Sequence, residues 1–356
     1  MPAWTRRDRF AAALAGEAAD RPPVSAWRHF VGSEYSPEEL ARSTEGFARH
    51  WDWDWVKVNP RITFYSEAWG SEFDPADYHD VLPRLVSSAI VILNDLGRIE
   101  AVDPRASAAF ADQIDAARRV RAALPDRPVL STVFSPLTVL LQLAGLSTFS
   151  TAGLYGSSEP ISRANLLGAP RGALDRALGA VAETLAAYVE VLVSPEVGLD
   201  GVFYAVTGTP GLVSRGEHER LSRPHDLKVL EAAGGAARIL HTCGANSHPE
   251  WFGDYPVEAL HWDQHAEGNP GLGEDFGPAT MGGVDHMALA TGSAEAMGRQ
   301  TAEALRARGG RPFLLAPSCS VPLDVREANL AAFGRAARRG EGSAGVWEKG
   351  ERREDG

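Results

Sequence analysis

Short apolar segments that alternate with long helical stretches are the feature of this sequence that most constrains its fold. Parallel strands require long crossover connections, so this alternation is typical of a parallel α/β sheet. We predict eight strands, at residues 24–27, 55–59, 129–134, 201–206, 238–242, 259–263, 280–284 and 312–316. We predict helices at residues 37–50, 107–123, 138–144, 171–193, 225–233, 293–308 and 325–338, after an amphipathic helix near the N-terminus.

Eight strands with intervening helices predict a single-domain (β/α)8 TIM barrel, and a doubly wound open sheet is the alternative. The 356 residues, 44% of them apolar, are enough to fill such a barrel. The long gap between the second and third strands predicts an excursion on the barrel rim. Residues 145–170, rich in Gly, Ser and Thr, predict a loop over one mouth, and the Gly-rich, charged tail at 338–356 is typical of disorder.

The net charge and the distribution of apolar residues limit the kinds of partner and the cellular compartment that we expect for this protein. The net charge of −12 argues against a nucleic acid or an anionic membrane as the main partner. No apolar run approaches the length of a membrane span, and the N-terminus lacks the apolar core of a signal peptide. We therefore expect a cytoplasmic protein, and in that reducing compartment a disulfide is the least expected fate of its thiols.

The only two cysteines, Cys243 and Cys319, form a constellation with His241. Residues i and i+2 of an extended segment point the same way, so His241 and Cys243 can converge on one ion at the end of the fifth predicted strand. Cys319 follows the eighth strand, and active sites of such barrels lie at the C-terminal strand ends. Imidazole and thiolate are zinc ligands, and three of them leave a fourth position open. Inert buried thiols with a core histidine, or a disulfide, are the alternatives.

Other polar residues at strand ends are candidates for substrate binding. Arg28, after the first strand, could clamp a carboxylate, phosphate or sulfonate, or form a structural ion pair. Lys57 and Asn59 alternate at the end of the second strand, so they either face the mouth or belong to a salt bridge inside the barrel.

Two further candidates lie on the fourth and sixth predicted strands. Tyr204 could project into the pocket, although an aromatic residue there also suits the core. Asp263 could be a fourth zinc ligand, an acceptor for the second nitrogen of His241, or a substrate contact.

Several motifs together resemble the uroporphyrinogen decarboxylase (URO-D) superfamily. They lie at residues 6–10, 20–24, 53–59, 241–244 (H-T-C-G), 282–285, 316–322 (A-P-S-C-S-V-P) and 327–330. The resemblance covers residues 5–337, which it identifies as one URO-D-like barrel domain. That superfamily has the (β/α)8 fold, in agreement with the strand count.

The resemblance implies one of two activities. True decarboxylases grip substrate carboxylates with two arginines in a M-R-Q-A-G-R loop, and here only Arg28 matches, because Gly32 stands at the second. Gln142 replaces the tyrosine of another decarboxylase motif. The other branch, the cobalamin:thiol methyltransferases, has His-x-Cys with a later Cys, which His241, Cys243 and Cys319 match.

In the methyltransferase branch, zinc binds a small thiol such as coenzyme M and lowers its pKa, so that the thiolate attacks a methyl group. The usual donor is methylcobalamin on a separate corrinoid protein. We therefore expect a zinc-dependent, methyltransferase-like enzyme that acts on a small thiol, with a corrinoid protein as a possible partner. Metal-free decarboxylation of a porphyrinogen and a non-catalytic, ligand-binding barrel with a structural zinc are the alternatives.

Overall fold

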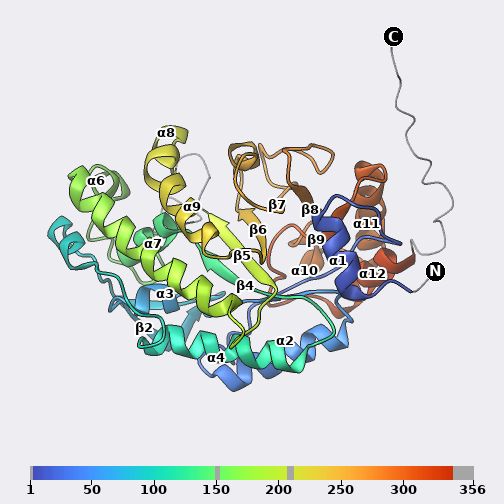
Figure 1. Cartoon of the computed structure of the whole chain (residues 1–356), viewed down its shortest axis with the longest axis horizontal. Coiled ribbons are helices and arrows are strands. Elements are labelled where there is room, and N and C mark those ends of the chain that lie inside the picture. The colour runs from blue at the N-terminus through green and yellow to red at the C-terminus, as the bar shows by residue number, and fades with distance from the viewer. Residues whose placement is uncertain (1–2, 149–152, 207–211, 340–356) are drawn as a thin grey trace, which may run out of the picture.

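A curled, seven-stranded parallel sheet forms the centre of the computed structural model, which describes residues 3–148, 153–206 and 212–339 (Figure 1). In spatial order its strands are β1 (Val56–Val58), β4 (Val129–Phe134), β5 (Gly201–Val206), β6 (Ala237–Thr242), β7 (Ala259–Trp262), β8 (Ala279–Val284) and β9 (Phe313–Pro317). Every neighbouring pair is parallel. This is the predicted α/β architecture, a TIM-like barrel.

The first predicted strand closes the curled sheet without forming a regular strand. Its Ser25 amide donates to the Leu315 carbonyl of β9 at 3.2 Å, and its Val24 carbonyl accepts from the Asp54 amide, just before β1, at 2.8 Å. Only isolated bridges form here, because the two prolines that precede Val24 have no amide hydrogen to donate. The segment therefore occupies the eighth position of the barrel with a reduced set of hydrogen bonds.

The predicted excursion between the first two sheet strands in the chain, β1 and β4, is present and carries its own structure. It contains α3 (Phe64–Glu67), an antiparallel hairpin of β2 (Glu72–His79) and β3 (Leu82–Ser87), and the short helix η1 (Leu93–Arg98). The sequence analysis did not predict the hairpin. Its register shifts between Asp74 and Tyr78, and such an irregularity breaks the two-residue alternation that marks a strand.

Helices cover the outer side of the sheet, as Figure 1 shows. The longer ones are α2 (Pro37–His50), α4 (Ala108–Ala123), α5 (Pro136–Leu143), α7 (Arg171–Val193), α9 (Arg223–Glu231), α11 (Ala294–Arg308) and α12 (Glu327–Arg339). Neighbours pack on one another: α2 on α4, α4 on α7, α7 on α9, and α11 on α12. These helices match the predicted ones in place, with ends displaced by one or two residues.

Shorter helices lie in the connections. They are α6 (Arg163–Leu167), α8 (Arg215–Glu217), η2 (His218–Ser222), η3 (Pro249–Phe252) and α10 (Ala288–Thr291). The helix α6 lies within residues 145–170, which we predicted to be a loop, so that prediction is partly wrong. The predicted tail at 338–356 lies almost wholly outside the described residues. Within those residues, no helix is both long enough and apolar enough to cross a membrane.

The inside of the barrel is filled by side chains from successive strands, and α1 (Arg6–Leu14) closes its N-terminal end. Phe10 of α1 packs on Trp55, with ring centroids 5.8 Å apart. Trp27 contacts both Trp55 at 5.6 Å and Phe203 at 5.4 Å. These large rings fill the barrel from its N-terminal end to its middle. Space for a catalytic site is therefore left at the C-terminal ends of the strands.

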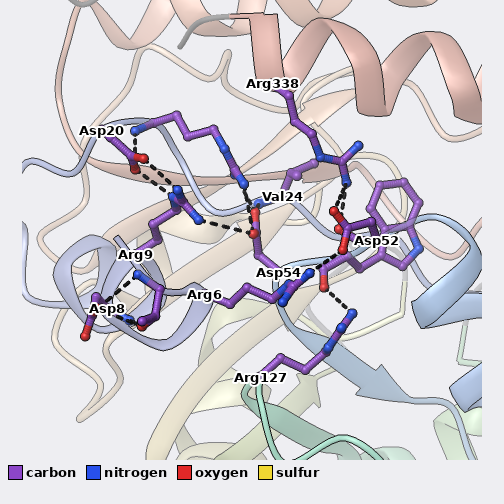
Figure 2. Close-up of polar contacts among 12 residues, drawn as sticks. Arg6, Asp8, Arg9, Asp20, Val24, Asp52, Asp54, Arg127 and Arg338 are labelled. Carbon is purple, nitrogen blue, oxygen red and sulfur yellow. Dashed lines mark hydrogen bonds and ion pairs between the residues drawn. The ribbon is translucent and has the colours of Figure 1, made fainter. Parts of the chain in front are cut away.

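A network of arginines and aspartates ties α1 and the strand beginnings together at the N-terminal end (Figure 2). Asp54, just before β1, accepts two hydrogen bonds from Arg21, at 2.5 and 3.0 Å, and one from the Val24 amide at 2.8 Å. Arg9 of α1 pairs with Asp20 at 2.6 Å, and Arg127 donates to the Trp53 carbonyl at 2.8 Å. The network therefore fixes the segment that closes the barrel.

We predict that Asp54→Asn destabilises the protein far more than Asp52→Asn. The Arg21 and Asp54 side chains are only 6% and 2% exposed, so replacing the carboxylate breaks an ion pair inside the protein, at a cost of about 3 kcal/mol or more. Asp52 pairs with Arg6. Their side chains are 56% and 29% exposed, respectively, and loss of such a surface pair costs about 0–1 kcal/mol. Urea denaturation of both variants measures the difference. Equal losses of stability would contradict the structural role given to Asp54.

Candidate metal centre

The structure brings His241, Cys243 and Cys319 together at the C-terminal ends of β6 and β9. The Cys243 and Cys319 sulfurs are 3.8 Å apart, and the Cys319 sulfur is 4.0 Å from Nε2 of His241. All three potential ligand atoms lie within 4.8 Å of one another. Among the described residues, this is the one group of three or more such side chains close enough to hold a metal ion.

The spacing of the three side chains suits a tetrahedral ion. Zinc–sulfur bonds of about 2.3 Å at a tetrahedral angle place two sulfurs about 3.8 Å apart. The separation of the Cys243 and Cys319 sulfurs, 3.8 Å, has that value. His241 is buried and the two thiols are partly buried, so a bound ion would lie below the protein surface with one position left for a substrate.

Local backbone features put these ligands in place. His241 is the penultimate residue of β6, and Gly244, with φ of 81°, lets the chain turn away directly after Cys243. Cys319 is held from both sides, because the Ser318 amide donates to the Val284 carbonyl at 2.8 Å and the Val321 amide donates to the Trp27 carbonyl at 2.8 Å. The closing segment of the barrel thus positions the third ligand.

The two thiols are in hydrogen-bond contact, and each shifts the pKa of the other. A hydrogen bond from Cys243 lowers the pKa of Cys319 well below its ordinary value, and burial opposes this shift. The same contact raises the pKa of Cys243. One sulfur therefore favours the thiolate form that metal ligands require.

A cavity of about 80 Å³ opens onto the ligands from the barrel mouth. One water needs roughly 10–15 Å³ on this scale, so the cavity has room for a small ligand. Aromatic and aliphatic side chains make up much of its wall. The lining residues are Trp27, His29, Lys57, Asn59, Pro60, Ile62, Thr132, Phe134, Thr138, Thr148, Phe203, Ala205, Val206, His241, Cys243, Cys319 and Ser320.

Lys57 and Asn59 line this cavity, as the alternation at the end of the second predicted strand suggested. The Lys57 ammonium donates to Oδ1 of Asn59 at 2.6 Å and lies 4.3 Å from the ring centroid of Phe203. Burial lowers the pKa of Lys57 to about 7, and the two nearby cysteines act in the opposite direction. No carboxylate is among the described residues that line the cavity, so none of these residues offers the Lys57 charge an acidic partner.

The structure does not place Arg28 or Tyr204 among the described residues that line the cavity, where the sequence analysis expected them. The Arg28 guanidinium donates to the Leu323 carbonyl at 2.8 Å. Tyr204 is fully buried on the outer side of β5, where its hydroxyl donates to Asp226 of α9 at 2.8 Å. Its neighbours Phe203 and Ala205 line the cavity, because successive side chains of a strand point to opposite faces, and Val206 lines it at the end of β5.

Asp263 lies beside the ligand group without joining it. Its carboxylate accepts from the His265 amide at 3.0 Å and lies 3.6 Å from Nδ1 of His286. It is not among the three side chains that converge, and Nδ1 of His241 has no hydrogen-bond partner among the described residues. The structure therefore does not bring Asp263 into the ligand group, and its predicted roles at the site stay predictions.

Two histidines at the site escaped the sequence analysis. His29 lines the cavity, and its position two residues after the cavity-lining Trp27 in an extended segment was the available signal. His261 of β7 is fully buried, with its ring centroid 4.7 Å from that of His241. Burial lowers the pKa of His261 well below its ordinary value, so it packs as a neutral ring beneath the ligands.

The fold and the ligand group define a TIM-like barrel with a potential metal site at its C-terminal strand ends. A model of the uroporphyrinogen decarboxylase (URO-D) family matches residues 5–340, so this chain belongs to that family. Among curated proteins, none matches the sequence significantly.

Solved structures agree on the fold. A methyltransferase from Methanosarcina mazei is similar to the chain with a TM-score of 0.74 and 19% sequence identity, over 95% of this chain and 99% of that one. A B12-independent methionine synthase from Shewanella sp. W3-18-1, in complex with selenomethionine, is similar with a TM-score of 0.55 and 12% identity, over 91% of this chain and 98% of that one. At these identities the likeness concerns the barrel fold.

We predict that Cys243→Ser and Cys319→Ser each abolish stoichiometric metal binding. Removing one of three ligands leaves a site too weak to retain an ion through purification, because thiolates supply much of the affinity for zinc. Ser320→Ala is the matched control, since Ser320 lines the same cavity and is not one of the three. Elemental analysis of protein purified without chelators measures the metal content. A cysteine variant that keeps one ion per chain would contradict the assignment.

Proposed function

We propose that this protein is a metal-dependent methyltransferase that acts on a small thiol, with zinc held by His241, Cys243 and Cys319. Membership of the URO-D family makes the chain an enzyme of that superfamily. The observation that carries the finer proposal is the convergence of its only two cysteines with a histidine beside a small cavity. Zinc, when bound, would lower the pKa of a coordinated thiol and so supply a nucleophilic sulfur at neutral pH.

The cavity walls suit a small, partly apolar thiol. Phe203, Phe134 and Ile62 exclude water from the reacting sulfur, and this strengthens the electrostatic interactions inside. Lys57 and Asn59 provide a donor pair for the rest of the thiol, in the place that we first expected Arg28 to fill. One imidazole and two thiolates would make a bound zinc ion formally neutral, so a bound thiolate would add one negative charge, which the Lys57 ammonium is placed to compensate.

The methyl donor in this proposal is methylcobalamin on a separate corrinoid protein. The small size of the described cavity supports an external donor. A corrinoid is much larger than this cavity, so the methyl group would be presented at the barrel mouth. The thiol would lie between the metal ligands and that mouth.

Metal-free decarboxylation of a porphyrinogen has weaker support. No arginine is among the described residues that line the cavity, Gly32 replaces a carboxylate-binding arginine of that branch, and the buried Gln142 replaces a tyrosine. We predict that the protein does not turn over uroporphyrinogen. Formation of coproporphyrinogen at an enzymatic rate, on the order of 1 s⁻¹ or above, would favour the decarboxylase instead.

X-ray absorption at the zinc edge tests the proposed thiol site. Zinc-loaded protein should show two sulfur neighbours and one imidazole, and a third sulfur should appear when 2-mercaptoethanol is added, at about 2.3 Å. Lys57→Met should weaken binding of an anionic thiol such as mercaptoacetate more than binding of 2-mercaptoethanol, because only mercaptoacetate has a carboxylate with which the Lys57 ammonium can also pair. An unchanged sulfur count at saturating thiol would refute the proposal.

A further inference from the structure

A histidine and a glutamate face each other behind the cavity wall, and neither has its hydrogen bonds satisfied there. Nδ1 of His29 lies 4.0 Å from Oε2 of Glu34. Both atoms are buried, and neither has a hydrogen-bond partner among the described residues. The gap is about 1 Å longer than a hydrogen bond, so a small side-chain rotation would join them. His29 lines the cavity, whereas the Glu34 side chain is fully buried.

The surroundings of Glu34 leave its charge poorly compensated. Its other oxygen, Oε1, accepts from the Tyr78 hydroxyl at 2.8 Å. Arg61 donates to the Glu34 backbone carbonyl at 3.0 Å, and its guanidinium forks onto the Glu67 carboxylate at 2.6 and 2.8 Å. Tyr35, whose ring lies 4.1 Å from that guanidinium, is the remaining titratable neighbour. The nearest cation is thus committed to another carboxylate.

Burial shifts the pKa values of both His29 and Glu34, and this determines which of them is protonated near neutral pH. Burial raises the pKa of Glu34 to about 7, and the Tyr78 hydrogen bond and Arg61 act in the opposite direction. Burial lowers the pKa of His29 to about 3, with a further contribution from Lys57. His29 therefore stays neutral while Glu34 exchanges a proton with its surroundings at physiological pH.

We infer that His29 and Glu34 form a proton relay that accepts the proton of the substrate thiol. The S–H bond breaks, its electron pair stays on sulfur, and the proton passes to Nε2 of His29, the nitrogen that does not face Glu34. The proton on Nδ1 passes at the same time to Oε2 of Glu34. His29 ends in its other neutral tautomer, and Glu34 ends as a carboxylic acid.

The direction of the relay follows from the chemistry of the cavity. A thiol with a pKa near about 8.5 must lose its proton before or as it binds, and a base matched to neutral pH makes this step fast. Glu34 is not among the described residues that line the cavity, and His29 lies between the cavity and the Glu34 carboxylate, so His29 is placed to carry the proton. This inference rests on the proposed thiol-binding function and adds the residues that make its first step possible.

The test follows thiol binding and needs no turnover. Full-length protein loaded with Co²⁺ in place of zinc is mixed with 2-mercaptoethanol in a stopped-flow instrument, between about pH 5.5 and 8.5, a range that spans the ordinary histidine and thiol pKa values. The rise of the sulfur-to-cobalt charge-transfer absorbance gives the binding rate. In the wild-type protein the rate should rise with pH and level off above about pH 7, where Glu34 is ionised.

Glu34→Gln should remove the plateau. Without the carboxylate, only thiolate already present in solution binds, so the rate should rise about tenfold per pH unit throughout, and at pH 7 it should be about tenfold or more below wild type. The cobalt absorbance of the protein before mixing shows that the variant is folded and loaded. A purely structural role for Glu34 would lower the amplitude without changing the pH profile.

Tyr78→Phe is the matched control, because it removes one hydroxyl and keeps the carboxylate. The hydrogen bond from Tyr78 favours ionised Glu34, so its loss should move the plateau to higher pH and leave its height unchanged. Identical profiles for wild type and Glu34→Gln would overturn the relay and leave the thiol site standing. No absorbance change with thiol in any of the three proteins would overturn the proposed function and the relay together.

Discussion

The hydrogen bonds that close the barrel position the metal ligands. The segment around Val24 bonds to β9 on one side and to the residues before β1 on the other, and a few residues later the Trp27 carbonyl receives the Val321 amide. Cys319 lies between these attachments, so the closure brings it to His241 and Cys243, which come from β6. The buried Arg21–Asp54 pair holds the same segment at its beginning. Stability at one end of the barrel and ligand geometry at the other therefore depend on one stretch of chain.

Electrostatic balance explains why the cavity suits a thiol. One neutral imidazole and two thiolates would cancel the charge of a zinc ion, and an added thiolate would leave one negative charge. Lys57 supplies a positive charge, and among the lining residues that the structure describes no carboxylate competes for it. Glu34, the nearest carboxylic acid behind His29, becomes neutral when it takes a proton. The zinc ligands, Lys57 and Glu34 would thus together keep the net charge of the site near zero. Uncompensated charge is costly in a buried site, because the dielectric constant there is low.

The architecture and the ligand group could be predicted from the sequence because both follow from the pattern of strands and helices along the chain and from the positions of residues at strand ends. Alternation of strands and helices gave the barrel, and the i, i+2 spacing with a later strand end gave His241, Cys243 and Cys319. The sequence could not predict which way Arg28 turns, because its guanidinium is bound by the Leu323 carbonyl, far away in the sequence. The direction of Tyr204 could not be predicted either, because neighbouring residues of a strand face opposite sides. Tyr204 faces the helices, whereas Phe203 and Ala205 face the cavity. The His29–Glu34 pair depends on the path of an irregular loop, for which periodicity gives no signal.

Anomalous diffraction from crystals of protein purified without chelators tests the central claim most directly. Data collected above and below the zinc absorption edge locate the metal independently of any refined coordinates. The account predicts one peak at full occupancy, about 2.0–2.3 Å from Nε2 of His241 and from the sulfurs of Cys243 and Cys319. A disulfide between the two cysteines, or a zinc-supplemented crystal without a peak at these atoms, would contradict it.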